Sequence, residues 1–212
     1  MNYQTLARLP SPTVHLVHGI HTSDPYKNIG KLKVYFHDAG FEDVVVHSYG
    51  FLPFFLARLK NPGIVERIKK FVKPGDIIVG YSNGALIGKM ITDDGIQLGG
   101  LVLINPAIDQ DVRFPKNVSW IHVYYNDGDD LVALSSILPF HPWGDMGRVG
   151  YRGPWDGRVR KFNFGRGMPK TDGHSDIFDG REDVHIRGPQ ISSNARRAWE
   201  RNVKVAALPP LP

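Results

Sequence analysis

Strand-like and helix-like segments alternate along this chain, and that alternation restricts the fold more than any other feature of the sequence. The clearest strand is residues 76–80, Asp-Ile-Ile-Val-Gly, a short continuous apolar run that is typical of the centre of a parallel sheet. A helix-like segment, 84–91, follows it directly. Parallel strands need a crossover between them, and the crossover is usually a helix. The pattern therefore predicts an α/β protein.

Six segments have the length and composition of strands. The predicted strands are residues 13–18, 43–48, 76–80, 100–105, 119–125 and 158–164, and the predicted helices are 28–39, 61–72, 84–91, 131–138 and 192–203. With 212 residues, 42% of them hydrophobic, and no repeat or linker, we expect one domain over 1–212 with an extended tail from about 204. We expect a single doubly wound, mostly parallel six-stranded sheet with helices on both faces. The strict alternation of 158–164 predicts a sheet edge.

A Gly-x-Ser-x-Gly motif lies between the third predicted strand and the following helix. It is Gly80-Tyr81-Ser82-Asn83-Gly84. The chain has 23 glycines, so the motif alone is weak, and its strand-to-helix context is what gives it meaning. Glycines at both ends let strand and helix approach closely, and the turn presents the serine hydroxyl at the carboxyl edge of the sheet. Ser82 is therefore the candidate nucleophile.

A serine hydroxyl needs a base to remove its proton, usually a histidine that a carboxylate orients. After such an elbow the expected chain order is Ser, then Asp or Glu, then His. Three histidines follow the later strands, and we favour His174, in a loop after the last strand, over His141 and His185. The fifth strand runs into an acidic turn that contains Asp127, Asp129 and Asp130. We favour Asp129 at the strand-to-helix junction, with Asp127 as its rival.

The oxyanion that forms in acyl transfer needs hydrogen-bond donors. We expect one to be the backbone N–H of Asn83, next to the nucleophile, and the other to be that of Ile20, in the loop after the first strand. His18 and His21 flank this donor, but two histidines without a third ligand make a poor metal site, so we predict no metal. We interpret His18 as a side chain that braces the loop.

Taken together, these motifs resemble the α/β-hydrolase superfamily. They are His18-Gly19 after strand one, Gly80 to Gly84 after strand three, Asp129 after strand five and Gly173-His174 after strand six. The resemblance extends from about residue 13 to 203 and is to small esterase, lipase and cutinase-like members. It implies a Ser-Asp-His triad, an acyl-enzyme intermediate and no cofactor. The usual lid after the fourth strand has little room in the short segment 108–117, so we expect a minimal fold with little or no lid.

The substrate expected from this resemblance is a carboxylic ester, either small or attached to a polymer. Tyr81 and the aromatic run after the second strand are candidate substrate-binding residues, above all Phe51 and Phe54, with Tyr49 and Phe55 beside them. Core packing under a loop is the other interpretation of this run. Trp143, Tyr151 and Trp155 are candidates for a cap or a sugar-stacking surface.

Composition excludes several classes of function. Without cysteine the chain has no disulfide, thiolate zinc site or cysteine nucleophile. The net charge of +5 leaves one alternative, a non-catalytic or polyanion- and surface-binding protein on the same scaffold. Its binding residues would be Arg148, Arg152, Arg158, Arg160 and Lys161. No nucleic-acid-binding motif accompanies them, so we expect no specific nucleic-acid partner.

Neither a signal peptide nor an apolar run long enough to span a bilayer is apparent in the sequence. We therefore expect a cytoplasmic protein without a transmembrane segment, with release by lysis left open. The sequence gives no indication of the oligomeric state.

Overall fold

A single six-stranded sheet forms the centre of the protein in the computed structural model, which describes residues 11–20, 24–129, 144–165, 176–179 and 181–206. The strand order is β2-β1-β3-β4-β5-β6, and all five pairings between neighbours are parallel. The strands are β1 (Val14–Val17), β2 (Val44–His47), β3 (Ile77–Tyr81), β4 (Gly100–Ile104), β5 (Ile121–Tyr125) and β6 (Val159–Asn163). The predicted six-stranded sheet is confirmed, and within the described residues it is parallel throughout.

Burial along the strands follows their residue patterns. Every residue of β3 and β4 is buried, as expected for continuous apolar strands covered on both faces. β6 lies at one edge of the sheet and is only partly buried, which agrees with the edge predicted from its alternating sequence. The sheet is therefore most deeply buried where β3 leads into the Gly-x-Ser-x-Gly motif.

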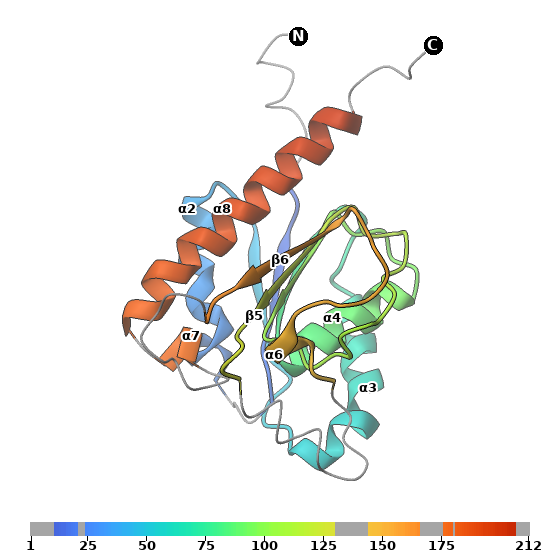
Figure 1. The fold of residues 1–212 in the computed structure, drawn as a ribbon, viewed down its shortest axis with the longest axis vertical. Helices are drawn as coiled ribbons and strands as arrows, with labels where there is room; N and C mark the ends of the chain where they lie inside the picture. Colours follow the sequence, from blue (N-terminus) through green and yellow to red (C-terminus); the bar gives the residue numbers. More distant parts are fainter. Residues whose placement is uncertain (1–10, 21–23, 130–143, 166–175, 180, 207–212) are drawn as a thin grey trace.

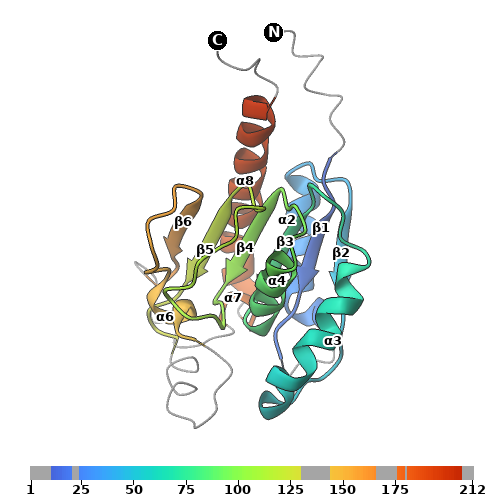
Figure 2. The same ribbon diagram turned by 90° about the vertical axis from the view of Figure 1, so that its right-hand side faces the viewer.

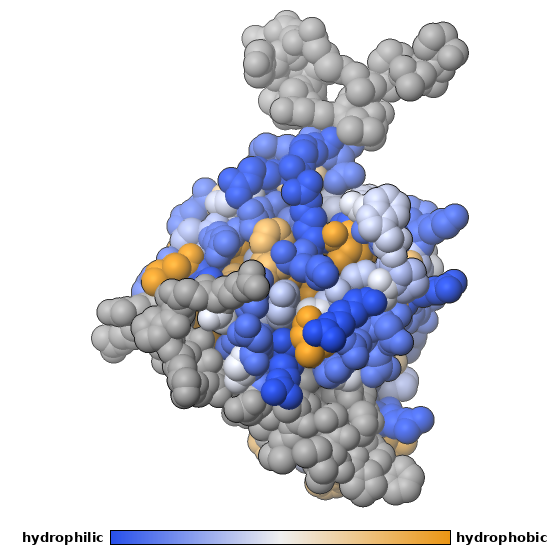
Figure 3. Space-filling model, in the orientation of Figure 1, coloured by the Kyte–Doolittle hydropathy of each residue, from blue (hydrophilic) through white to orange (hydrophobic). Residues whose placement is uncertain are grey.

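Helices cover both faces of the sheet (Figure 2). One face packs against α3 (Ala57–Lys69) and α4 (Asn83–Asp93), and the other packs against α2 (Lys33–Asp38) and α8 (Arg181–Ala206). The shorter elements are η1 (Pro25–Lys27), η2 (Ile29–Leu32), η3 (Phe54–Leu56), α6 (Met146–Val149) and α7 (Asp176–Asp179) (Figure 1). The molecular face that carries α8 is mainly hydrophilic (Figure 3), because α8 turns its apolar side to the sheet. No described helix is apolar enough over its length to cross a bilayer.

The chain changes direction across the sheet at β1. It passes from β1 outward to β2 and then returns to β3 on the other side of β1. In open α/β sheets, ligands bind beyond the carboxyl ends of the strands at such a switch point. The loop after β1 and the turn after β3 therefore meet at the position where a functional site is expected.

Two helices begin earlier than the sequence predicts. α3 begins at Ala57, so Asn61 and Pro62 lie inside it instead of forming its start. α8 begins at Arg181 and runs to Ala206 through Pro189, so it includes His185 and ends beyond the predicted start of the tail. The helix predicted over 131–138 lies outside the described residues.

Candidate active site

Ser82 lies at a sharp turn between the end of β3 and the first residue of α4. Its backbone has φ 54° and ψ −121°, a conformation that is unfavourable for a residue with a Cβ atom. Its N–H donates to the carbonyl of Ile104 at the end of β4 (2.9 Å), and its own carbonyl accepts from Ala85 in α4 (3.0 Å). Hydrogen bonds to a strand and a helix thus hold this strained turn in place.

Three glycines make the close approaches around Ser82 sterically feasible. A Cβ atom at Gly80 would lie 2.4 Å from the carbonyl oxygen of Gly84, and one at Gly84 would lie 2.1 Å from that of Val17 in β1. A Cβ atom at Gly19, in the loop after β1, would lie 3.1 Å from the Cβ atom of Ser82. The strand, the helix and the loop after β1 can converge on the serine only because these positions carry no side chain.

The two predicted oxyanion donors come from the loop and the turn that meet here. Asn83 is the first residue of α4, and N–H groups in the first turn of a helix have no acceptor within that helix. Ile20 is half-buried and packs against the core cluster on the α4 side of the sheet. Both residues belong to backbone segments that adjoin Ser82.

A series of hydrogen bonds joins the loop after β1 to the start of α4. The side-chain amides of Asn83 and Asn61 exchange two hydrogen bonds (2.8 and 3.0 Å), and Asn83 Nδ2 also donates to the Tyr49 hydroxyl (3.4 Å). That hydroxyl donates to the His18 carbonyl (2.7 Å), and the Tyr49 ring stacks on the His18 imidazole with centroids 3.9 Å apart. Tyr49 therefore connects both segments that carry the predicted oxyanion donors.

His18 uses both ring nitrogens within this arrangement. Its Nδ1 donates to the Gly19 carbonyl (2.5 Å), so Nε2 carries no proton and accepts from the backbone N–H of Tyr49 (3.1 Å). Burial lowers the pKa of His18, although the bond to Gly19 acts in the opposite direction. The side chain is therefore neutral near pH 7 and braces its loop, as interpreted from the sequence. Among the described residues, no group of three or more His, Cys, Asp or Glu side chains is arranged to hold a metal ion.

Burial differs sharply between the two rival carboxylates after β5. Asp129 is fully buried, and its N–H donates to the Asn126 carbonyl (3.0 Å). Asp127 is exposed, and its carboxylate accepts from the side chain of Asn163 at the end of β6 (3.0 Å). Asp130 lies outside the described residues. The turn thus keeps one carboxylate inside the protein and gives the other a partner at the surface.

Only one of the three candidate histidines is described. His185 is an exposed residue of α8, and its Nδ1 is hydrogen-bonded to the Tyr35 hydroxyl of α2. His141 and the favoured base His174 lie outside the described residues. The side chain of His185 is thus engaged in the contact between α2 and α8.

The chain after His174 returns to the vicinity of the serine. It resumes with α7, in which Phe178 packs edge-on against Tyr81, with ring centroids 4.9 Å apart. Tyr81 precedes Ser82 directly and is only 3% exposed, so its ring belongs to the core contact between β3 and α7.

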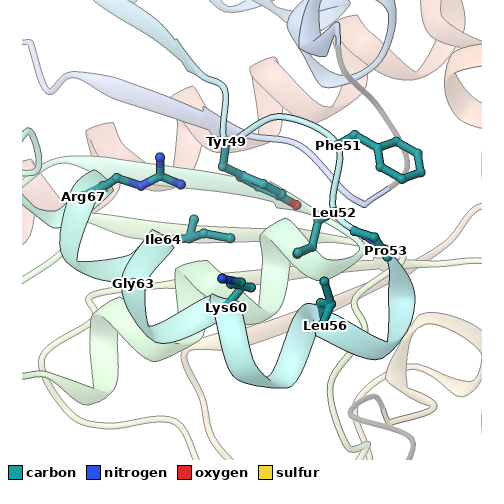
Figure 4. Close-up of a pocket in the computed structure, with 9 residues that line it drawn as sticks. All are labelled: Tyr49, Phe51, Leu52, Pro53, Leu56, Lys60, Gly63, Ile64 and Arg67. Atoms are coloured by element: carbon teal, nitrogen blue, oxygen red, sulfur yellow. The ribbon is translucent and has the colours of Figure 1, made fainter.

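A groove of about 340 Å³ lies between α3 and the loop after β2 (Figure 4). Phe51 lines it and is 61% exposed, whereas Phe55 is exposed nearby and the side chain of Phe54 lies outside the description. Tyr49 forms part of the groove wall. The groove therefore borders the same tyrosine that holds the loop after β1.

The basic residues near β6 divide into two groups. Arg158 donates to the carbonyls of Pro115 (2.7 Å) and Val118 (2.9 Å) and pairs with Asp156 (2.5 Å), so its role in the described structure is to hold loops together. A second hollow of about 610 Å³ is lined by Arg152, Arg160 and Lys161 together with Trp155, which is 94% exposed. Tyr151 is buried and donates to the Pro154 carbonyl, while Trp143 lies outside the described residues.

Several solved structures with a similar fold are described as esterases, lipases or hydrolases. No protein-family model and no curated protein matches the sequence. The esterase domain of a Rhodothermus marinus protein is 13% identical, with a TM-score of 0.55 over 90% of this chain and 88% of that one. A monoacylglycerol lipase from Paleococcus ferrophilus is 13% identical, with a TM-score of 0.52 over 90% of this chain and 97% of that one. A predicted CIB-like hydrolase from Thermoplasma acidophilum is 15% identical, with a TM-score of 0.52 over 87% and 88%. The chain has the α/β-hydrolase fold.

Proposed function

We propose that this protein is a serine hydrolase that cleaves carboxylic esters through an acyl-enzyme intermediate. The observation that carries the proposal is the strained backbone of Ser82, with φ 54°, directly between a buried strand and a helix. Among the described residues, Asn105 is the only other non-glycine residue with positive φ. Backbone strain of this kind persists where the surrounding structure enforces it, and it is concentrated at functional sites.

In the proposed triad, Ser82 is the nucleophile, His174 the general base and Asp129 the residue that orients the base. Support for Asp129 comes from its complete burial, because a buried carboxylate needs a partner, whereas Asp127 is exposed and bound to Asn163. Support for His174 comes from α7, which begins two residues later and packs against the residue before Ser82.

The proposed reaction has two steps. His174 takes the proton from Ser82 Oγ, which attacks the ester carbonyl, and the N–H groups of Ile20 and Asn83 stabilise the oxyanion. His174 then gives the proton to the leaving alcohol. In the second step His174 takes a proton from water, which attacks the acyl carbonyl, and Ser82 regains its proton as the acid leaves. No cofactor takes part in this sequence.

Esters are the proposed substrates because alcohols leave more easily than amines, so the step demands less of the acid. The esterase and lipase titles of the similar structures support the same class. Between β4 and β5 the described chain forms only turns and extended segments, which is consistent with the predicted short lid and suits small or polymer-attached esters.

The test is turnover of p-nitrophenyl esters of increasing acyl length, together with labelling by a fluorophosphonate. We expect both in the parent protein and a loss of at least about 10³-fold in turnover, with no labelling, in Ser82→Ala. Ser48→Ala, at an exposed serine after β2, is the matched control and is expected to behave as the parent. Equal turnover in Ser82→Ala and the parent would reject the triad, and the non-catalytic, anion-binding alternative would then be tested with polyanions.

A further inference from the structure

The groove between α3 and the loop after β2 changes character along its length (Figure 4). Its apolar part is lined by Phe51, Leu52, Pro53 and Leu56. Lys60 and Arg67 line it further along α3, seven residues apart, so they lie two turns apart on one side of the helix. The groove is therefore amphipathic, with an apolar part and a cationic part.

The two cations of the groove are not neutralised within the described structure. Neither Lys60 nor Arg67 forms an ion pair with a described residue, and no carboxylate is among the described lining residues. In contrast, Lys69 on the same helix pairs with both Glu66 and Asp94 at 2.7 Å. Both side chains are exposed to solvent, so an anionic group in the groove would meet two cations that no described carboxylate neutralises.

Gly63 lies between these two cations and also lines the groove. A Cβ atom at this position would meet nothing within 4 Å, so packing does not require a glycine here. Glycine inside a helix is less favourable than alanine. A ligand that lies directly against the backbone of this turn would account for the absence of a side chain.

The size and the surroundings of the groove favour a single extended apolar chain. Its volume of about 340 Å³ is near the lower end of the range of small-molecule sites, which runs from about 300 to 1,000 Å³. Phe51 lines the groove and is 61% exposed, and Phe55 and Leu59, which precede the lining residues Leu56 and Lys60 in the sequence, are 76 and 74% exposed. Exposed apolar side chains grouped beside a cavity mark a binding surface more often than scattered ones do.

We propose that this groove binds a single-chain fatty carboxylate, with its chain against the apolar part and its carboxylate between Lys60 and Arg67. The choice of a carboxylate head rests on the proposed function, because ester hydrolysis releases one, whereas the amphipathic groove is independent of it. Tyr49 belongs both to the groove wall and to the hydrogen bonds that hold the His18 carbonyl. A bound ligand therefore contacts the residue that connects the two predicted oxyanion segments.

Isothermal titration calorimetry on the full chain with Ser82→Ala, which removes turnover from the signal, tests the proposal. The probes are dodecanoate below its micelle-forming concentration, dodecyl glucoside with the same chain and no charge, and butyrate with the same head and a short chain. We expect dodecanoate to bind on the order of tenfold more tightly than either, because only it engages both parts of the groove. Absent dodecanoate binding, or equal binding of dodecyl glucoside, would overturn the proposal.

Two matched pairs of variants locate the site. Gly63→Leu fills the groove and is expected to weaken dodecanoate binding at least about tenfold, whereas Gly63→Ala leaves most of the groove open and stays within about twofold. Lys60→Gln with Arg67→Gln is expected to weaken it about tenfold, whereas Arg58→Gln, an exposed cation of α3 outside the groove lining, has no such effect. Equal affinity within either pair would overturn the assignment.

The hydrolase proposal and the groove proposal can be rejected independently of each other. Dodecanoate binding with the expected variant pattern, in a protein that neither turns over esters nor reacts with a fluorophosphonate, would support the groove and reject the hydrolase. Ester turnover that depends on Ser82, in a protein that does not bind dodecanoate, would support the hydrolase and reject the groove.

Discussion

At the residue scale, burial separates the two carboxylates of the turn after β5. If Asp129 orients the base, Asp129→Asn keeps the size of the side chain but removes the charge that stabilises the imidazolium, and we expect kcat to fall on the order of 10³- to 10⁴-fold. Asp127→Asn removes a carboxylate that is exposed and bound to Asn163, so we expect kcat to change less than about threefold. Steady-state kinetics with a p-nitrophenyl ester compare the two variants. The reverse order of effects would make Asp127 the acid.

Tyr49 is the residue whose hydroxyl connects the loop after β1 with Asn83. Tyr49→Phe keeps the ring stacked on His18 and removes only the oxygen, which leaves the His18 carbonyl without this donor. Losing one buried hydrogen bond costs about 1–3 kcal/mol, so we expect kcat to fall about tenfold. KM should change little, because the ring that forms part of the groove wall is kept and only the hydroxyl that holds the predicted oxyanion segments is removed.

The comparison for this variant is Tyr26→Phe, at a tyrosine that is 61% exposed. We expect Tyr26→Phe to keep the kcat of the parent. A purely structural role for Tyr49 would appear as a lower midpoint of thermal unfolding with unchanged kcat at 25 °C, and that result would contradict the positioning role.

At the scale of elements, α4 can cross over β1 only because Gly84 has no side chain. A Cβ atom at Gly84 would lie 2.1 Å from a backbone oxygen of β1, so neither partner can move without shifting the sheet or the helix. We expect Gly84→Ala to lower the free energy of unfolding by about 3 kcal/mol or more. Gly63→Ala, in an open position of α3, should raise it by about 0.5–1 kcal/mol. Urea unfolding measures both, and equal stabilities would refute the steric argument.

The sequence predicts the strands better than the helix ends, and the reason is physical. β3 and β4 are buried on both faces, so their apolar runs are a direct consequence of their position. The sequence predicts that a helix begins at Asn61 and Pro62, but Asn61 lies buried inside α3, where its side-chain amide pairs with that of Asn83 in α4. Gly188 lies inside α8 N-terminal to the predicted helix 192–203, and its lack of a side chain lets the helix approach Tyr35 of α2.

The same distinction applies to the candidate site. Ser82 and its glycines are visible in the sequence because the strain and the close contacts of the elbow arise from consecutive residues. From the sequence Tyr49 is only a candidate wall of an acyl site, whereas its hydrogen bond to the His18 carbonyl spans 31 positions. No local sequence pattern predicts that contact, because it depends on how β1 and β2 pair in the sheet.

At the scale of the whole molecule, two buried histidines make stability depend on pH. His47, at the end of β2, is hydrogen-bonded to His15, which in turn contacts Asp76. Burial, and then the neighbouring His15, lowers the pKa of His47 to about 4. Burial, and then Arg160 and Arg201, lowers the pKa of His122 to about 4 as well. Both side chains are therefore neutral in the folded protein at pH values where the unfolded chain begins to bind protons.

Because both pKa values are lower in the folded state than the usual 6.5, the unfolded chain binds more protons between about pH 6.5 and 4. The stability that each of these histidines contributes is therefore fully present above about pH 6.5 and decreases as the pH falls through this window. The expected loss between pH 7.5 and pH 5 is about 2 kcal/mol for each histidine. The pKa of Asp76 is also lowered in the folded protein. The stability that this shift contributes is lost only below about pH 3.8, the usual pKa of the carboxyl group, so it does not change between pH 7.5 and pH 5.

His122→Phe isolates one of these contributions. The ring lies between Trp120 and Phe162, with centroids 4.7 and 5.3 Å away, and its Nδ1 has no hydrogen-bond partner among the described residues, so a phenyl ring fits the same contacts. We expect the variant to match or exceed the parent's free energy of unfolding at pH 7.5 and to lose about 2 kcal/mol less on acidification to pH 5. Urea unfolding at the two pH values measures the difference. An identical loss in both proteins would mean that His122 titrates alike in the folded and unfolded states, and the pH dependence would then have to come from other groups, among them His47 and His18, whose pKa values are also lowered.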